Sequence, residues 1–84
     1  MTKSGRVAPA GQFVSARVRS VTGGSSPQIQ IRHGKSIVAP LVRSVAATNG
    51  AEIDQRSAPD DCRNGIWLEV TGNPAAIEVV VLYR

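Results

Sequence analysis

The chain has 84 residues, a formal net charge of +4, one cysteine and one histidine. A domain of this size buries a modest core, and many such domains need a disulfide, a metal or a partner chain for additional stability. Cys62 alone cannot form an internal disulfide. A structural metal site needs about four ligands, and Cys62 and His33 are the only soft or borderline candidates in the chain. The composition therefore favours stabilisation by association with other chains, and we expect no metal and no cofactor.

The N-terminal segment differs in composition from the rest of the chain. Residues 1–11 contain small residues, Pro9 and two glycines without apolar periodicity, so we interpret them as a flexible or extended arm before a domain at residues 12–84. The arm carries Lys3 and Arg6 but lacks the apolar run of a secretory signal. No part of the chain reaches the roughly 18 apolar residues of a membrane span. We therefore expect a protein made in a cytoplasm, without a membrane partner.

The domain is predicted to begin with a strand over residues 13–21. Apolar and polar side chains alternate along it, which is typical of a strand with one face in the core and the other in solvent. The apolar set is Val14, Ala16 and Val18, and the polar set is Ser15, Arg17 and Arg19. Residues 22–27 are rich in glycine and serine and predict a turn, and residues 28–32 predict a second alternating strand.

The middle of the chain carries mixed signals. Residues 37–45 are rich in Val and Ile, and we predict a strand with Pro40 at a bulge or an edge, because proline breaks a helix interior. An Asn-Gly pair then marks a turn before a short strand around Ile53. Residues 56–64 are polar and are predicted to form a loop.

The final strand, residues 76–84, is apolar on both faces. If one alternate set of side chains enters the core, Val80 and Leu82 face outward. The inner set is Ile77, Val79 and Val81. An exposed apolar patch on a small domain marks a contact surface. Burying Val80 and Leu82 against a neighbour would contribute roughly 3–5 kcal/mol, at ~1.5–3 kcal/mol per side chain.

Together with a strand over residues 65–72, these segments are six short strands about ten residues apart, separated by Gly, Pro and Asn turns. This spacing is typical of all-β sandwiches and barrels. We therefore predict a small single-domain β-sandwich, or a jelly-roll-like barrel, of about six to eight short antiparallel strands.

The charges are distributed unevenly along the chain. Residues 1–43 hold seven basic groups and no acid, whereas residues 44–84 hold three arginines and six acids. Such an imbalance indicates either an acidic partner, including nucleic acid, or contact between the two halves. We favour contact between the halves, within one subunit or between neighbours, because strands from both halves must pack together in so short a chain.

No group of residues in the sequence indicates catalysis. His33 adjoins Gly34 in a predicted turn, and nothing local to any serine resembles a nucleophile elbow. Cys62 follows two aspartates, which raise the pKa of a thiol, and we expect it to be inert. The same aspartates are too few to form a calcium loop. We therefore expect no catalytic, cofactor-binding or metal-binding residues, and no enzymatic activity.

A nucleic-acid surface is the main alternative from the residues themselves. Arg17 and Arg19 share one strand face, and Trp67 could act as a stacking platform, as in small single-strand-binding barrels. Aromatic residues are also enriched at protein interfaces. We favour the interface role for Trp67, and we include Tyr83 with it as a second aromatic contact residue.

The order of features also resembles a known class of protein. An arm, the segment "VSARVRSVTGGSSPQIQIRHG", a strand pair, the hairpin "GIWLEVTGNP" and the strand "IEVVVLYR" resemble small β-sandwich virion proteins of tailed bacteriophages, nearest the head decoration, or cement, proteins. The pattern "GxWxxVTG...IEVVV" is also similar to modules of phage tail and fibre proteins. The resemblance covers most of residues 12–84. It implies a trimer on the outer capsid surface that clamps neighbouring capsomers without catalytic machinery.

The resulting expectation is a non-catalytic virion structural protein. We expect a capsid decoration protein whose partners are other copies of itself, as a homotrimer, and the major capsid protein, located on the virion after assembly in the host cytoplasm. The expected interface residues are Val80, Leu82, Trp67, Tyr83, Arg17 and Arg19. The alternatives are a phage tail, fibre or receptor-binding module, and a small OB-like nucleic-acid-binding barrel.

Overall fold

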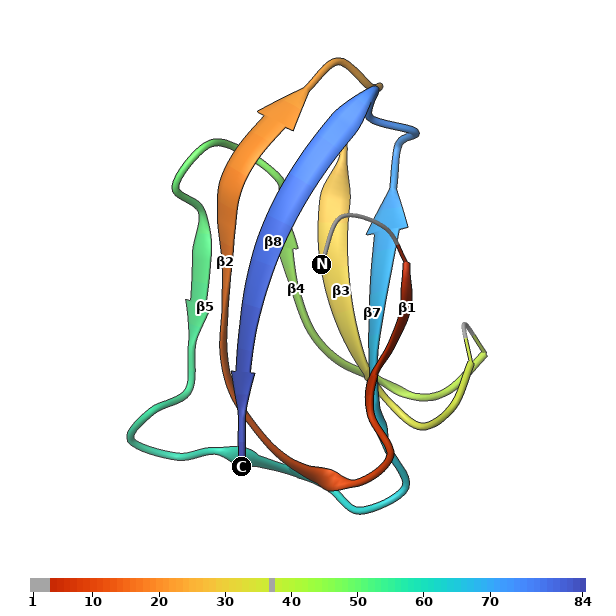
Figure 1. Cartoon of the computed structure of the whole chain (residues 1–84), viewed down its shortest axis with the longest axis vertical. Coiled ribbons are helices and arrows are strands. Elements are labelled where there is room, and N and C mark those ends of the chain that lie inside the picture. The colour runs from red at the N-terminus through yellow and green to blue at the C-terminus, as the bar shows by residue number, and fades with distance from the viewer. Residues whose placement is uncertain (1–3, 37) are drawn as a thin grey trace.

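A computed structural model describes residues 4–36 and 38–84 of the chain. Over these ranges the structure consists of eight strands in two antiparallel sheets, without a helix, as shown in Figure 1. The predicted all-β fold is therefore confirmed. The strands are β1 (Gly5–Ala8), β2 (Gly11–Thr22), β3 (Gln28–His33), β4 (Leu41–Ala46), β5 (Glu52–Asp54), β6 (Asp60–Cys62), β7 (Ile66–Thr71) and β8 (Ala76–Tyr83). Among the described residues no helix is long and apolar enough to cross a membrane.

The strands are divided between two sheets. Sheet A has the order β1-β7-β3-β4. In sheet B the long strand β2 pairs with β5 and β6 along one edge and with β8 along the other. The pairing of β2 with β8 extends from Phe13 opposite Tyr83 to Thr22 opposite Ala76, so this ribbon forms most of sheet B. Figure 1 shows the β2–β8 ribbon in front of β3, β4 and β7.

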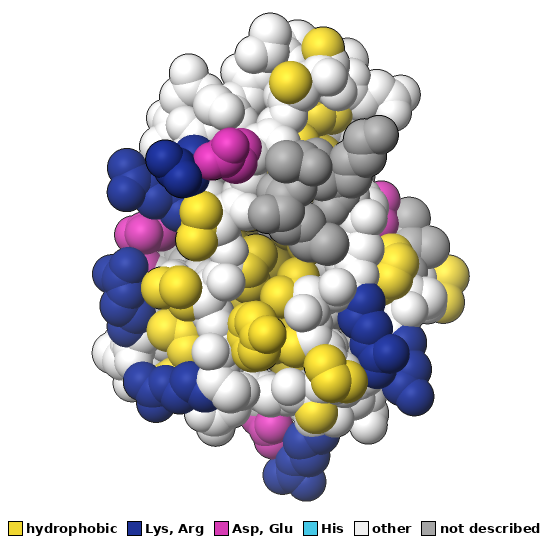
Figure 2. Space-filling model, in the orientation of Figure 1, with side chains coloured by type: hydrophobic (Ala, Val, Ile, Leu, Met, Phe, Trp, Pro, Cys, Tyr) yellow, Lys and Arg dark blue, Asp and Glu magenta, His cyan; other side chains and the backbone are white. Residues whose placement is uncertain are grey.

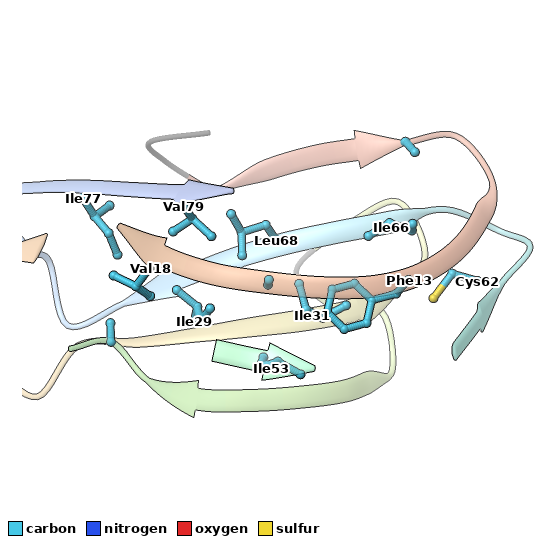
Figure 3. Close-up of a cluster of buried hydrophobic side chains, with 13 residues drawn as sticks. Phe13, Val18, Ile29, Ile31, Ile53, Cys62, Ile66, Leu68, Ile77 and Val79 are labelled. Atoms are coloured by element: carbon cyan, nitrogen blue, oxygen red, sulfur yellow. The ribbon is translucent and has the colours of Figure 1, made fainter. Parts of the chain in front are cut away.

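The core lies between the sheets and follows from the alternation of apolar residues. The inward-facing side chains from both sheets pack in one cluster, shown in Figure 3, and most have no exposed surface. Sheet A contributes Ile29, Ile31, Ile66 and Leu68, and sheet B contributes Phe13, Val18, Ile77 and Val79. Each fully buried side chain of this size stabilises the fold by about 1.5–3 kcal/mol. On β3 and β7 the residues between them, such as Gln30 and Trp67, face outward.

The strand predicted over residues 37–45 is shorter in the structure. β4 begins at Leu41, immediately after Pro40, while Val38 and Ala39 belong to the connection from β3. Pro40 has no N–H to donate, but its carbonyl accepts a hydrogen bond from the His33 backbone N–H at 2.9 Å. Proline therefore stands just before the strand and closes the turn rather than forming a bulge within it. Ile37 lies outside the described residues.

The polar segment at residues 56–64 contains a short strand that the loop prediction missed. Asp60–Cys62 forms β6, which pairs with the start of β2. Cys62 is fully buried in the core, while Asp61, the middle residue of β6, is exposed. Three residues with two carboxylates carry little strand propensity, so the pairing depends on the position of β2 rather than on the local sequence.

The segment interpreted as an arm is partly built into the sandwich. Gly5–Ala8 forms β1 at the edge of sheet A, with Gly5 opposite Leu68 and Arg6 opposite Trp67. Ala8 is only 2% exposed, and Val7 packs against the core. The prediction allowed either a flexible or an extended arm. Residues 5–8 are extended, but they belong to the folded domain. Residues 1–3 lie outside the described part of the chain.

Candidate interaction surface

The outer face of the β2–β8 ribbon brings together four of the six expected interface residues. The strand register places Arg17 opposite Val80 and Ser15 opposite Leu82. Val80 is 40% exposed and Leu82 is 47% exposed, whereas Ile77 and Val79 are buried. The predicted division of β8 into an inner and an outer apolar face is therefore present in the structure.

These side chains line a shallow concavity of about 480 Å³ on the outer face of sheet B. Its lining consists of Ser15, Arg17, Arg19, Glu52, Arg56, Val80 and Leu82. Figure 2 shows this side of the molecule, with apolar side chains in the centre and basic side chains along the left margin. We call this group of seven residues the concavity.

The concavity is organised in three parallel stripes. β8 supplies the apolar stripe, with Val80 and Leu82, and β2 supplies a basic stripe, with Arg17 and Arg19. β5 pairs with the other edge of β2 and supplies Glu52, which lies opposite Arg17 in the register. Since neighbouring strands lie about 4.8 Å apart, apolar, basic and acidic groups adjoin one another across the face.

Most charges at the concavity are already paired. Arg19 Nη1 lies 3.2 Å from Glu78 Oε1, and Arg56 lies 3.5 Å from Glu52 and 3.4 Å from Asp54. Arg17 has no ion pair with any residue that the structure describes. The three arginines and the three carboxylates leave no formal net charge. This face consequently has the properties of a mixed apolar and polar surface rather than those of a basic patch.

The two aromatic residues expected at the interface lie elsewhere. Trp67 is on the outer face of sheet A, on the far side of the sandwich, where the register places it between Arg6 and Arg32. Its indole N–H donates a hydrogen bond to Glu69 Oε1 at 3.0 Å, and the side chain is half-buried. Tyr83 is on β8 and is 49% exposed, but it does not line the concavity. Trp67 and Arg17 therefore do not form one surface, which removes the stacking groove considered from the sequence.

Arg32, beside Trp67, is used within the chain. Its Nη1 donates to the Ala39 carbonyl at 2.8 Å and its Nη2 donates to Gln30 Oε1 at 2.9 Å. The guanidinium thus joins β3 to the connection that follows it. Arg32 Nε is buried and has no partner among the described residues.

The basic and acidic halves of the chain meet within the one molecule. Arg43 on β4 forms two hydrogen bonds to the Asp60 carboxylate, at 3.0 and 3.1 Å, and this pair links sheet A to β6 of sheet B. The hydrogen bond and the charge of Asp60 raise the pKa of Arg43 above its ordinary value. Arg19 and Glu78 are a second pair between the halves. The contact that the charge distribution predicted is therefore observed.

The two side chains considered as catalytic or metal-binding candidates, His33 and Cys62, also take part in the fold. His33 Nε2 accepts a hydrogen bond from the Asn64 backbone N–H at 3.2 Å. Burial is the main cause of a raised pKa of the Cys62 thiol, and the nearby Asp60 raises it further. The thiol therefore stays protonated near neutral pH. The described residues include no group of three or more His, Cys, Asp and Glu side chains that could hold a metal ion.

Three residues of the concavity were not expected from the sequence. Ser15 shares the alternation phase of Arg17 and could have been found from it. Glu52 and Arg56 are brought to β2 by the pairing of β5, which spans more than thirty residues of sequence, as in Ser15 opposite Asp54. No local pattern identifies such a partner.

No protein-family model, curated protein or solved structure matches this chain. A functional assignment therefore rests on the geometry of the concavity and on the physical properties of its lining.

Proposed function

We propose that this chain is a non-catalytic structural protein that acts by assembly, with the outer face of sheet B as its contact surface. The observation that carries the proposal is the exposure of Val80 and Leu82 in a concavity where two of the three lining arginines are paired with carboxylates. Because less than half of each side chain is exposed, complete burial contributes about 1–3 kcal/mol for the pair, less than a fully exposed pair would. Polar groups around an apolar centre are typical of protein–protein contacts.

Within this class, a capsid decoration protein of a tailed bacteriophage is our specific candidate. The order of segments resembles that class, and a small sandwich without a disulfide gains stability by binding to a larger body. Its partners are then other copies of this chain and the major capsid protein. Many copies on one shell add avidity to a modest contact at each site.

The charge arrangement favours a protein partner over nucleic acid. A protein that binds nucleic acid gains affinity by releasing counterions from phosphates, which requires an excess of unpaired cations. At the concavity Arg19 and Arg56 are paired with carboxylates. No aromatic side chain of the described residues lines it, whereas binding of single strands uses stacking on aromatic rings. The same lack of aromatic rings weighs against a carbohydrate-binding surface in a receptor-binding module.

The proposal is tested by replacing the apolar stripe. The double variant Val80→Ser with Leu82→Ser is compared with the parent by light scattering after size-exclusion chromatography and by co-sedimentation with tailed-phage heads. We expect the parent to form a multimer or to sediment with heads, and the double variant to lose either property by about fivefold to a hundredfold.

The matched control is Ser44→Ala, which alters an exposed residue of β4 in sheet A. Retention of assembly by the double variant, or equal loss in the control, would show that the outer face of sheet B is not the contact surface. A parent that is monomeric and binds no particle would remove the assembly function itself.

A further inference from the structure

The exposed large apolar side chains of the described residues fall into two groups on different parts of the molecule. Val80, Leu82 and Tyr83 belong to β8. Val38, which is 87% exposed, and Leu41, which is 50% exposed, lie on the connection from β3 to β4 and at the start of β4. The assembly proposed above accounts for the first group only. The second group is therefore available for a further contact.

The two groups lie on surfaces of opposite curvature. Val80 and Leu82 of the first group line the concavity, whereas the second group belongs to a segment that projects beyond the sheets on the right of Figure 1. We call this segment, residues 34–36 and 38–41, the protrusion. A two-fold axis through the concavity would place one hollow against another and leave unfilled volume, which a close-packed interface disfavours. A convex segment fills the hollow instead.

The protrusion is held in a defined shape by hydrogen bonds. The His33 backbone N–H donates to the Pro40 carbonyl at 2.9 Å, and Arg32 Nη1 donates to the Ala39 carbonyl at 2.8 Å. The Ala39 N–H in turn donates to the Ser36 carbonyl at 3.1 Å. A segment that is already ordered loses less conformational entropy when it docks. Arg32, which is partly buried, therefore helps to fix the backbone next to the exposed Val38.

The charges of the two surfaces are compatible. Lys35 is the one charged residue in residues 34–42, so the protrusion carries no carboxylate. The carboxylate among the residues that line the concavity is Glu52, whose side chain keeps 35% of its surface exposed. The lining arginines and the carboxylates paired with or beside them, Glu52, Asp54 and Glu78, have no formal net charge, so Lys35 would meet no net repulsion there.

We propose that the protrusion of one copy packs into the concavity of a second copy, with Val38 and Leu41 against Val80 and Leu82. This inference rests on the proposed function, and it defines the self-contact as head-to-tail. Each copy then offers one protrusion and one concavity, so that identical contacts repeat around a closed ring when the rotation between copies closes. The same contact covers Val38 and Leu41 of one copy and Val80 and Leu82 of the next.

The test uses two double variants that each disable one side of the contact. The protrusion variant carries Val38→Ser and Leu41→Ser, and the concavity variant carries Val80→Ser and Leu82→Ser. Circular dichroism of each variant checks that the β fold is retained, and Ser44→Ala is the control. Either double variant alone should associate at least about tenfold more weakly than the parent.

The decisive measurement is an equimolar mixture of the two variants, one of them labelled with ¹⁵N, examined by native mass spectrometry. In a head-to-tail contact the mixture keeps one intact pair of surfaces, the protrusion of the concavity variant and the concavity of the protrusion variant. We expect a mixed dimer at concentrations where neither variant associates alone.

A mixture that stays monomeric while the parent assembles would overturn the head-to-tail contact and leave the assembly function standing. A protrusion variant that assembles as well as the parent would do the same. A parent that is monomeric in solution at millimolar concentration also overturns the inference, and co-sedimentation with phage heads then decides the proposed function separately.

Discussion

The outer faces of the two sheets differ in how many of their side chains make contacts within the chain. On sheet A, Trp67 donates to Glu69, Arg32 donates to Gln30 and to a backbone carbonyl, and Ser4 Oγ accepts the Val70 N–H at 2.8 Å. On sheet B, Val80 and Leu82 are exposed beside Arg17, which has no ion pair within the described residues. Sheet A is largely satisfied within the chain, apart from Leu41 at its edge, whereas sheet B has a surface that a partner would complete.

The comparison shows that composition alone does not identify an interaction surface. Sheet A carries the single tryptophan and three arginines, which are residue types enriched at binding hot spots. In this molecule the tryptophan and two of those arginines, Arg32 and Arg43, make internal hydrogen bonds. The aliphatic pair on β8 is less conspicuous, yet it is the pair left uncovered.

The largest expected effect concerns β1, which covers the edge of β7 in sheet A. Deleting residues 1–8 exposes the edge of β7 and removes the buried Ala8 side chain. We expect the free energy of unfolding to fall by about 2–4 kcal/mol, because several backbone hydrogen bonds and some apolar burial are lost. Urea denaturation followed by circular dichroism measures this change. Unchanged stability would show that β1 is a dispensable arm after all.

The next effect contrasts one arginine from each face. Arg32→Ala removes two side-chain hydrogen bonds and a packed aliphatic stem, so we expect a loss of about 1–3 kcal/mol in folding stability. Arg17→Ala should change folding stability by no more than about 0.5 kcal/mol, because the side chain is exposed and unpaired. The same denaturation experiment measures both variants. Equal losses in the two would remove the distinction between the faces.

A smaller effect is expected at Trp67. Trp67→Phe keeps an aromatic ring but removes the hydrogen bond to Glu69, so folding stability should decrease by about 0.5–1.5 kcal/mol while assembly is retained. Denaturation measures the first quantity and light scattering the second. If this variant folds normally but fails to assemble, the original expectation that Trp67 is an interface residue is restored.

A similarly small change in folding is expected when two of the acids of sheet B, Glu52 and Glu78, are neutralised. Glu52→Gln with Glu78→Gln leaves exposed ion pairs broken, and such pairs are worth at most about 1 kcal/mol each. The variant should gain weak oligonucleotide binding that decreases with salt, since Arg19 loses Glu78 and Arg56 keeps only Asp54 as a paired carboxylate. Fluorescence anisotropy with a labelled single strand at two salt concentrations measures this. Binding by the parent at physiological salt would favour a nucleic-acid function.

Much of the strand pattern and part of the surface could be predicted from the sequence. The alternation in β8 predicted that Val80 and Leu82 face away from Ile77 and Val79, and the structure has this arrangement. The same reasoning placed Arg17 on an outer face of β2. The prediction was incomplete where pairing overrides local preference, as in β6, whose two aspartates favour a loop by themselves.

The division between sequence and tertiary structure has a physical basis. Alternation has a period of two residues and is a local property, so the sequence by itself determined which side chains of regular strands such as β3, β7 and β8 share a face. In β2 the register shifts near Phe13 and Val18 interrupt this period, and Phe13, Val14, Ser15 and Ala16 are all buried. Which strands become neighbours depends on long-range pairing, and this decided that Glu52 lies opposite Arg17 and that Trp67 is on the other sheet. The concavity and the paired charges around it exist only because strands distant in sequence adjoin β2, and residue spacing along the chain contains no record of that contact.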